Sequence, residues 1–462
     1  DAKEEAYFLR LSKYQDRLMQ YYEDNPDFFR PLSRRAEMIN NFLKPGLADL
    51  CVSRSSFKWG IPVDFDEGHV IYVWIDALSN YITGIGYHPD GSSEMYRKYW
   101  PADLHVIGKD IVRFHTIYWP IILMALGEPL PKQVLGHPWM LFGEDKMSKS
   151  KGNVIYADEL AARFGTDAVR YYLLAEMPFA QDGSITYESF LNKYNIDLAN
   201  TLGNLVNRTV AMANKYFGGA VARPASSEEV DRDLASCAED AASRFVALMD
   251  EYRNADAVDV VMNLAKRCNK YIDETAPWVL AKEEKTERLG AVLYHLLEAI
   301  RFLAVLLQPV MPDTCAAIAA QIGAAAEEVT LPSAQDGFGQ RDAYRVGEAT
   351  PLFARLDVTK VLEELAAEVA AKVVACEPIP KAKKLLKLTL DDGSGTPSVV
   401  ASGIAQYYAP DDLVGKTVAV VANLKPATLC GVESRGMILA ADAADGVKVV
   451  FLDGVEPGSR IR

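Results

Sequence analysis

A short basic loop at residues 143–153 carries the side chains best suited to chemistry. It reads GEDKMSKSKGN, with three lysines within six residues and two serines between them. An apolar, β-rich run at 133–142 precedes it and a helical pattern at 157–170 follows. A lysine ammonium is a point charge on a flexible stem, so it can follow a phosphate whose charge moves during a reaction. The loop is a candidate phosphate site; a solvated charged turn is the alternative for a basic run alone.

The exact residue sequence of the loop favours the phosphate site over the solvated turn. Residues 146–150 read KMSKS, identical to a signature of class I aminoacyl-tRNA synthetases. In that family the loop closes on the triphosphate of ATP and stabilises the transition state of amino-acid adenylation. The resemblance implies that Lys146 and Lys149 are catalytic and contact ATP with Mg²⁺, Lys149 more strongly, and that Ser148 also belongs to the ATP site.

A sheet must position this loop. Apolar, β-rich runs at 69–75, 104–107 and 133–142 alternate with helical patterns, one of them at 111–126. Continuous apolar runs are typical of strands buried on both faces. The alternation predicts parallel β/α units of a Rossmann-like half-sheet, in which ligands bind beyond the carboxyl ends of the strands.

Five residues near two of these strand ends could form an apolar pocket. Trp74, Ala77 and Tyr81 cluster where one predicted strand ends. Ile111 and His115 stand four apart on the helix after the next strand, hence on one face. Aromatic walls suit a thioether, because sulfur packs well against rings. Without the lysine loop, the same residues would be read as ordinary core.

The segments around these residues resemble the methionine-pocket segments of methionyl-tRNA synthetases. They read YVWIDA at 72–77, IGKDI at 107–111 and FH at 114–115, and the resemblance covers nearly the whole chain. It implies a methionine site made by Trp74, Ala77, Tyr81, Asp110, Ile111 and His115.

A second signature of that family, HIGH, does not occur among these 462 residues, whose six histidines stand singly. We therefore expect an N-terminally incomplete synthetase, in which residues 1–65 end an inserted connective domain. Whether such a chain is active alone stays open. The six cysteines form no C-x-x-C pair, so the residues present do not support a zinc site.

A helical pattern continues from 191 to about 308, and a helical bundle is expected over 191–356. In its first helix, leucines at 198, 202 and 205 mark a buried stripe, while Asn204 and Arg208 lie on the opposite side. Amides, guanidinium groups and aromatic rings read unpaired RNA bases. The resemblance implies that Asn204, Arg208 and Trp278 read a CAU anticodon; a solvated polar face is the alternative.

The C-terminal part changes to short β-rich runs. A helix is expected at 361–371, and five strands after it predict an OB-like barrel. It resembles the tRNA-binding module of many bacterial methionyl-tRNA synthetases, which often dimerises. A basic edge and a second segment would bind tRNA through Lys381, Lys383, Lys384, Lys387, Asn423 and Lys425. A solubilising edge strand is the alternative reading of the lysines.

The fold class predicted is therefore multidomain: a Rossmann-like half-sheet, a helical anticodon-binding bundle and an OB-fold. The boundaries expected are 1–65 for the connective remainder, 66–142 for the half-sheet, 143–190 for the KMSKS loop and stem-contact region, 191–356 for the bundle, 357–375 for a linker helix and 376–462 for the OB-fold.

The function expected is that of a methionine–tRNA ligase, with ATP, methionine and tRNA(Met) as partners and a homodimer as its assembly. The net charge of −14 argues against general nucleic-acid binding but not against local RNA contacts. Scattered cysteines suit a cytoplasmic protein. A non-catalytic tRNA-binding protein is the alternative. A synthetase for valine, isoleucine, leucine or cysteine is disfavoured, because nothing resembles the editing insertion that the branched amino acids require.

Overall fold

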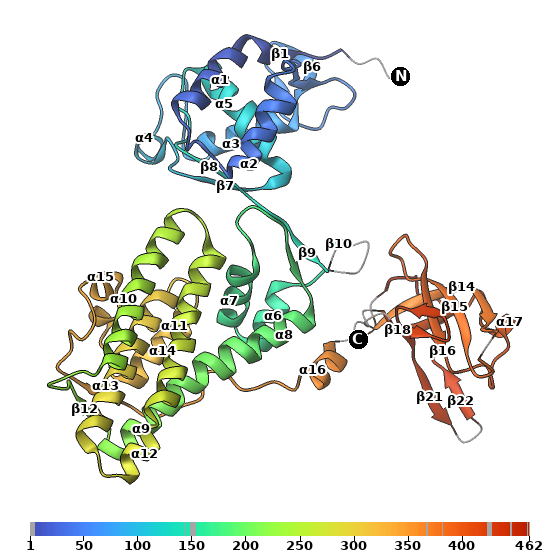
Figure 1. Cartoon of the computed structure of the whole chain (residues 1–462). Helices are drawn as coiled ribbons and strands as arrows, with labels where there is room; N and C mark the ends of the chain where they lie inside the picture. The colour runs from blue at the N-terminus through green and yellow to red at the C-terminus, as the bar shows by residue number, and fades with distance from the viewer. Residues whose placement is uncertain are drawn as a thin grey trace. The chain divides into compact units, whose positions relative to one another are not determined.

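The computed structural model describes residues 5–143, 145–147, 154–365, 368–380, 382–422, 427–443, 446–459 and 461. The chain divides into two compact units (Figure 1). The first unit comprises Asp1–Trp139 and Pro178–Asp182, and the second comprises Met140–Met177 and Gly183–Arg462. The chain therefore passes between the two units three times, after Trp139, after Met177 and after Asp182.

The first unit contains the predicted parallel sheet. Its strand order is β2 (Phe29–Arg30), β8 (Val134–His137), β7 (His105–Gly108), and both pairings are parallel. A helical segment follows β7: a 3-10 turn (Lys109–Ile111), a π-helical turn (Phe114–Tyr118) and α5 (Trp119–Leu126). α1 (Gln15–Asp24), α2 (Leu32–Met38) and α4 (Glu94–Tyr99) surround an apolar core. This β/α unit is the half-sheet that the alternating pattern predicted.

The strand predicted at 69–75 is wrong in extent and in pairing. β6 (Asp66–Ile71) lies in a separate antiparallel sheet between β4 (Ser53–Arg54) and β5 (Pro62–Val63). α3 (Val73–Thr83) begins two residues later and buries Leu78 and Ile82. A short apolar run fits a buried strand and a buried helix equally well, so periodicity could not separate them.

The run at 133–142 forms two strands instead of one. β8 ends at His137 and β9 (Met140–Phe142) begins after Pro138, which has no N–H for a ladder. β9 belongs to the second unit, where it pairs with β10 (Asp145–Lys146) and, in parallel, with β11 (Gly183–Ile185). The lysine motif thus begins in the return strand of a hairpin.

Helices form the body of the second unit. α6 (Ala157–Phe164) and α7 (Thr166–Glu176) lead to one long helical run of α8 (Tyr187–Lys193), a π-helical stretch (Tyr194–Gly203) and α9 (Asn204–Phe217). α10 (Glu229–Asp250), α11 (Asn254–Thr275), α12 (Pro277–Lys282), α13 (Thr286–Leu307) and α14 (Pro312–Ile322) follow. α13 is long and apolar enough to cross a membrane, yet all its residues from 291 to 307 are buried in the bundle. It is the central core helix that its all-round apolar pattern predicted.

The C-terminal strands form a nearly closed antiparallel barrel, consistent with an OB-fold. Its order is β16 (Ser398–Ser402), β15 (Leu386–Asp391), β14 (Glu368–Pro378), β17 (Thr417–Val421), β20 (Met437–Ile438). The Arg435 N–H donates to the Val399 carbonyl at 2.9 Å and draws the two edges together. The helix expected at 361–371 is wrong at its end: α16 (Val358–Leu365) stops and β14 begins at Glu368. Alanine and glutamate favour a helix, but pairing of β14 on both edges outweighs that preference.

Candidate functional site

One face of α3 carries three of the predicted pocket residues, because Trp74, Ala77 and Tyr81 are spaced by three and four along the helix. The Trp74 ring stacks on Phe114, with centroids 3.6 Å apart and planes 14° from parallel. Trp74 and Phe114 are half-buried, whereas Ala77 is exposed. The two rings form an aromatic wall beside an open helix face. Phe114 was not among the predicted site residues; its place next to His115 was the available signal.

His115 joins the other end of this face to the following helical segment. Its Nδ1 lies 3.0 Å from the Ile111 carbonyl oxygen, which can only accept, so Nδ1 carries the proton. Its Nε2 lies 2.8 Å from the Tyr81 hydroxyl. Burial lowers the pKa of His115, and in the neutral ring Nε2 accepts from Tyr81. The hydrogen bond to Ile111 thus sets the tautomer of His115, and the hydrogen bond to Nε2 sets the direction of the Tyr81 hydroxyl.

His105 lies beneath Tyr81 and was not assigned a role from the sequence. Its ring centroid is 4.4 Å from that of Tyr81 and 6.1 Å from that of His115. It is buried, and its Nε2 has no hydrogen-bond partner among the residues that the structure describes. Burial, helped by the nearby His115, lowers the pKa of His105 to about 4. The surroundings of Tyr81 therefore carry no charge from His105 at neutral pH, which would suit an apolar ligand side chain.

This burial makes the stability of the first unit depend on pH. Between pH 6.5 and about 4 the unfolded chain binds a proton that folded His105 does not. The free energy of unfolding should therefore fall by about 3 kcal/mol as the pH drops through this window and level off below it. Five of the six tryptophans belong to the first unit, so urea titrations followed by tryptophan fluorescence report on it. His105→Phe should flatten the profile, whereas exposed His88→Gln should not; equal profiles for both would contradict the assignment.

Asp110 and Ile111 lie in the turn that begins this helical segment. Ile111 packs against the core, whereas Asp110 is exposed and accepts from the Trp139 Nε1–H at 3.4 Å. Gly108 allows this turn to close, because a Cβ there would stand 2.6 Å from Asp110 Oδ1. The predicted methionine residues thus all lie in the first unit, on α3 and on the segment after β7.

The lysine motif lies in the second unit. Lys146 is the exposed last residue of β10, opposite Leu141 of β9. Met147 packs against the helical core and so anchors the motif at one end. Ser148 and Lys149 lie outside the described residues. The structure therefore shows the strand and the core contact from which the loop starts. The contact of the motif with ATP remains a prediction.

The predicted anticodon residues lie on α9 and α12. α11 contacts the long helix that ends in α9, and it precedes α12 in the chain. Leu198, Leu202 and Leu205 are fully buried, as predicted, and Asn204 is exposed on the other side of the helix. Trp278 is the second residue of α12 and is 47% exposed. The side-chain amide of Asn269, near the end of α11, donates to the Thr201 carbonyl at 3.0 Å. Asn204, the first residue of α9, lies three residues after Thr201. Trp278, on α12, lies nine residues after Asn269.

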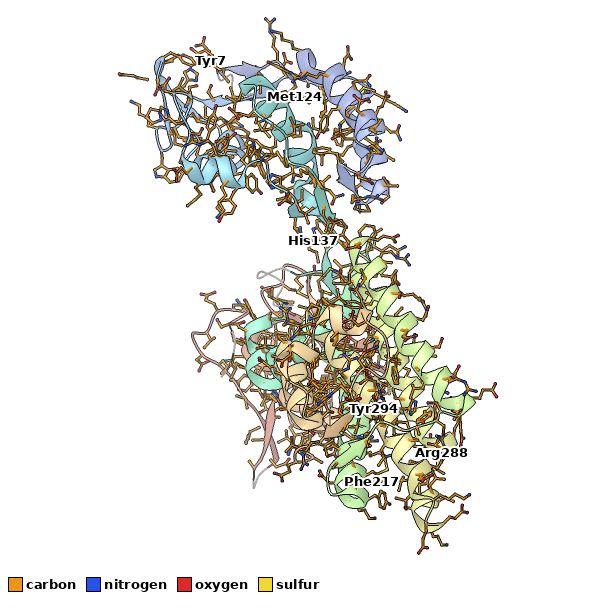
Figure 2. The ribbon with its side chains drawn as sticks, turned by 90° about the vertical axis from the view of Figure 1, so that its left-hand side faces the viewer. Tyr7, Met124, His137, Phe217, Arg288 and Tyr294 are labelled. Atoms are coloured by element: carbon orange, nitrogen blue, oxygen red, sulfur yellow. The ribbon has the colours of Figure 1, made fainter. Side chains whose placement is uncertain are left out.

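The same end of the bundle is closed by aromatic and charged residues. Phe217 ends α9 and lies near Arg288 at the start of α13 (Figure 2). A Cβ on Gly290 would touch the Phe217 ring at 3.4 Å. The Arg288 guanidinium pairs with fully buried Asp231 at 2.6 Å, and with the Tyr271 hydroxyl it lowers the pKa of that carboxyl. This network ties α10, α11 and α13 together at this end of the bundle.

The barrel presents part of the predicted basic edge. Lys383 and Lys384 are exposed, and Lys387 on β15 forms an ion pair with Glu377 on β14 at 2.7 Å. Lys381, Asn423 and Lys425 lie outside the described residues. Over the part of the chain that the structure describes, no three His, Cys, Asp or Glu side chains gather as a metal site would require.

Comparison with known proteins shows which class this fold and motif define. Residues 2–210 match the family "tRNA synthetases class I (M)", residues 222–355 the anticodon-binding domain of methionyl tRNA ligase, and residues 369–460 a putative tRNA-binding domain. The last match starts near the observed first residue of β14, ahead of the expected boundary at 376.

Individual relatives narrow the class further. The methionine–tRNA ligase of Clostridium acetobutylicum is 51% identical over all of this chain and 76% of its own length. That of Bacillus subtilis is 48% identical over 100% and 75%. A Mycobacterium tuberculosis methionyl-tRNA synthetase structure in complex with methionyl-adenylate matches with a TM-score of 0.71 and 41% identity, over 76% of this chain and 69% of that one. The chain belongs to the methionyl-tRNA synthetase family.

As a class I aminoacyl-tRNA synthetase it is a ligase that uses ATP, methionine and tRNA. The expected fold class is confirmed in its three parts, the Rossmann-like sheet, the helical bundle and the barrel. The non-catalytic tRNA-binding alternative is disfavoured, because the relatives over the full chain are ligases.

Proposed function

We propose that the side chain of methionine binds between α3 and the helical segment after β7, against Trp74, Ala77, Tyr81, Ile111 and His115. The observation that carries this proposal is the aromatic wall of Trp74 and Phe114 beside the Tyr81–His115 hydrogen bond. A thioether gains from sulfur–ring contacts, and two neutral histidines avoid a buried charge beside it. Asp110 organises the rim through its hydrogen bond to Trp139.

Adenylation at this site needs positioning and charge stabilisation. The methionine carboxylate attacks the α-phosphorus of ATP, the bond to pyrophosphate breaks, and methionyl-adenylate forms. A ribose hydroxyl of the tRNA end then attacks the methionyl carbonyl carbon and loses its proton, the bond to the phosphate breaks, and AMP leaves. No side chain has to form a covalent intermediate. Lys146 and Lys149, with Ser148, hold the phosphates and stabilise the charge on the departing pyrophosphate. Mg²⁺ would be bound mainly by the phosphates and water, as is usual for nucleotide-bound magnesium.

Amino-acid-dependent ATP–pyrophosphate exchange tests the proposal directly. The purified chain should exchange with methionine and with none of the other nineteen amino acids. A pocket that selects by shape discriminates weakly between apolar side chains, so leucine and isoleucine at high concentration are the critical controls. Exchange with a different amino acid, or silence with all twenty, would contradict the proposal.

For tRNA(Met), we propose that Asn204 and Arg208 hydrogen-bond the edges of anticodon bases and that Trp278 stacks on one of them. The support is local: the long helix that carries Asn204 and α11 touch at the Asn269–Thr201 contact, and α11 leads directly into α12, which carries Trp278. An indole that is 47% exposed in a well-packed bundle offers an open face to a base.

Trp278→Ala should impair recognition of tRNA without changing the activation of methionine. We expect about a tenfold loss in kcat/KM for tRNA aminoacylation, because one base–aromatic stack contributes about 1–3 kcal/mol. Methionine-dependent exchange should not change. Val279→Ala, at the next and similarly exposed position, is the matched control. A loss of exchange equal to the loss of aminoacylation would show a general folding defect instead.

The remaining assignments follow from the barrel and the relatives. We propose that Lys381, Lys383, Lys384, Lys387, Asn423 and Lys425 bind the tRNA backbone, that the barrel mediates a homodimer, and that the enzyme works in the cytoplasm with other translation enzymes. We keep the domain boundaries expected from the sequence, except that the barrel begins at Glu368 with β14. Binding of tRNA that weakens steeply with salt would support the backbone contacts.

A further inference from the structure

Four residues are joined at the point where the chain leaves the first unit. The Lys109 ammonium lies 2.6 Å from Asp182 Oδ2. The backbone N–H of Trp139 donates to Asp182 Oδ1 at 3.0 Å. Lys109 also stands over the Trp139 ring, 4.1 Å from its centroid, and the indole N–H reaches Asp110. One carboxylate and one ammonium thus hold three segments that are far apart in sequence.

The cluster lies where two segments of the chain leave the first unit. Trp139 and Asp182 are the last residues of the first unit in their segments, and β9 and β11 begin directly after them, at Met140 and Gly183. Those two strands pair in parallel, with Met140 opposite Gly183. The crossing segments are therefore held together twice, by the cluster before the boundary and by the strand ladder after it.

The third segment of the cluster belongs to the methionine site. Lys109 stands between Gly108, the end of β7, and Asp110, the first residue of the proposed rim. β9 in turn is the first strand of the hairpin that leads to Lys146. Within the first unit, the cluster thus joins Trp139, the residue directly before this hairpin, to the segment that carries Asp110.

The ion pair is well placed to hold this geometry. The side chains of Lys109 and Asp182 are 16% and 27% exposed, so solvent screens them less than a surface pair. The hydrogen bond from Lys109 lowers the pKa of Asp182, which therefore stays charged at neutral pH. The ammonium over the indole adds a cation–π contact.

We propose that Lys109 and Asp182 are positioning residues for adenylation: within the first unit, with Trp139, they fix the two chain ends from which β9 and β11 continue. This inference rests on the proposed function of the pocket and the lysine loop. Neither side chain has to touch methionine or ATP. Their effect would reach the reaction through the position of Lys146 and Lys149, where an error of about 1 Å can cost up to about 100-fold in rate.

The test compares Asp182→Asn, which keeps the shape and loses the charge, with Lys109→Met and Lys109→Arg. Asp182→Asn and Lys109→Met should each lower kcat for methionine-dependent exchange about tenfold and leave the KM for methionine within about twofold. Lys109→Arg should retain most activity, because a guanidinium keeps the charge and stacks on an indole. The matched control is Lys132→Met, which breaks a lysine–aspartate pair of 2.5 Å in the same unit whose side chains are 66% and 87% exposed.

Hydrogen exchange provides a readout that does not need catalysis. In Asp182→Asn and Lys109→Met, backbone amides of 140–143 and 183–185 should exchange several-fold faster than in the wild type, while those of the bundle should not. If the wild type shows no pyrophosphate exchange, the proposed function fails and these amides alone decide whether the cluster fixes the two chain ends. Unchanged amides and unchanged kcat would overturn the inference. So would parallel losses in kcat, methionine affinity and melting temperature, which indicate mere structural support, or equal effects of Lys132→Met.

Discussion

Lys149→Ala is expected to lower the rate of methionine-dependent ATP–pyrophosphate exchange by about 100- to 1,000-fold while the KM for methionine stays within about twofold. A group that stabilises developing charge contributes about 3–4 kcal/mol to the transition state and little to the ground state. In the proposed reaction that charge builds on the departing pyrophosphate, where a lysine of the KMSKS motif would stand. Steady-state exchange over a range of methionine and ATP concentrations measures both quantities.

The loop itself offers a matched control for this substitution. Lys151 is in the same basic run but outside the five-residue motif, and Lys151→Ala removes the same charge. It should change the exchange rate by about threefold or less, as expected for a screened charge at the margin of a site. Comparable losses for Lys149→Ala and Lys151→Ala would mean that the loop acts only through its overall charge. A loss of methionine affinity equal to the loss in rate would also contradict the role of Lys149.

Trp74→Ala should weaken methionine binding by about 100-fold, because truncation of a packed aromatic side chain costs about 3 kcal/mol or more. The indole is one half of the stacked wall with Phe114, so its removal also leaves that ring uncovered. The rate of adenylation at saturating methionine should fall much less, since Trp74 contacts only the amino-acid side chain in the proposed pose. Equilibrium binding of methionine and the KM in exchange should move together.

A second tryptophan of the same unit controls for this change. Trp59 is 89% exposed, and Trp59→Ala removes the same side chain from the surface. Methionine affinity should be unaffected by it. If both variants bind methionine like the wild type, the pocket does not lie on α3. If Trp74→Ala loses stability in urea as well as affinity, Phe114→Leu, which keeps the wall apolar, becomes the deciding variant.

Several features of this protein follow from local sequence. The all-round apolar pattern of α13 and the leucine stripe of the long helix are properties of short segments, and the structure contains both. Of the five strands expected in the barrel, four contribute to its sheet, as β15, β16, β17 and β20, whereas the last forms β22 in a separate hairpin and β14 was not expected. The motif at 146–150 was readable because its letters are specific in themselves. Residue types and spacing near α3 and β7 predicted aromatic side chains there, and the structure brings Trp74 against Phe114 and Tyr81 against His115.

Other features needed the folded chain, because contacts between distant segments decide them. The apolar run around Trp74 did not reveal that this residue lies on a helix, because a buried helix and a buried strand can have the same short apolar pattern. Residues 368–371 carry helix-favouring alanine and glutamate, yet pairing on both edges makes them a strand.

The sequence by itself determined the chemical inventory: the lysine motif, the aromatic pocket residues, the planar side chains for RNA and the order of the domains. The tertiary structure decided which of these meet. Stacking of Trp74 on Phe114, the neutral His105 beneath Tyr81, and the meeting of Lys109, Trp139 and Asp182 join positions 24 to 73 residues apart. Such contacts arise from the packing of whole elements, and no local pattern of letters records them.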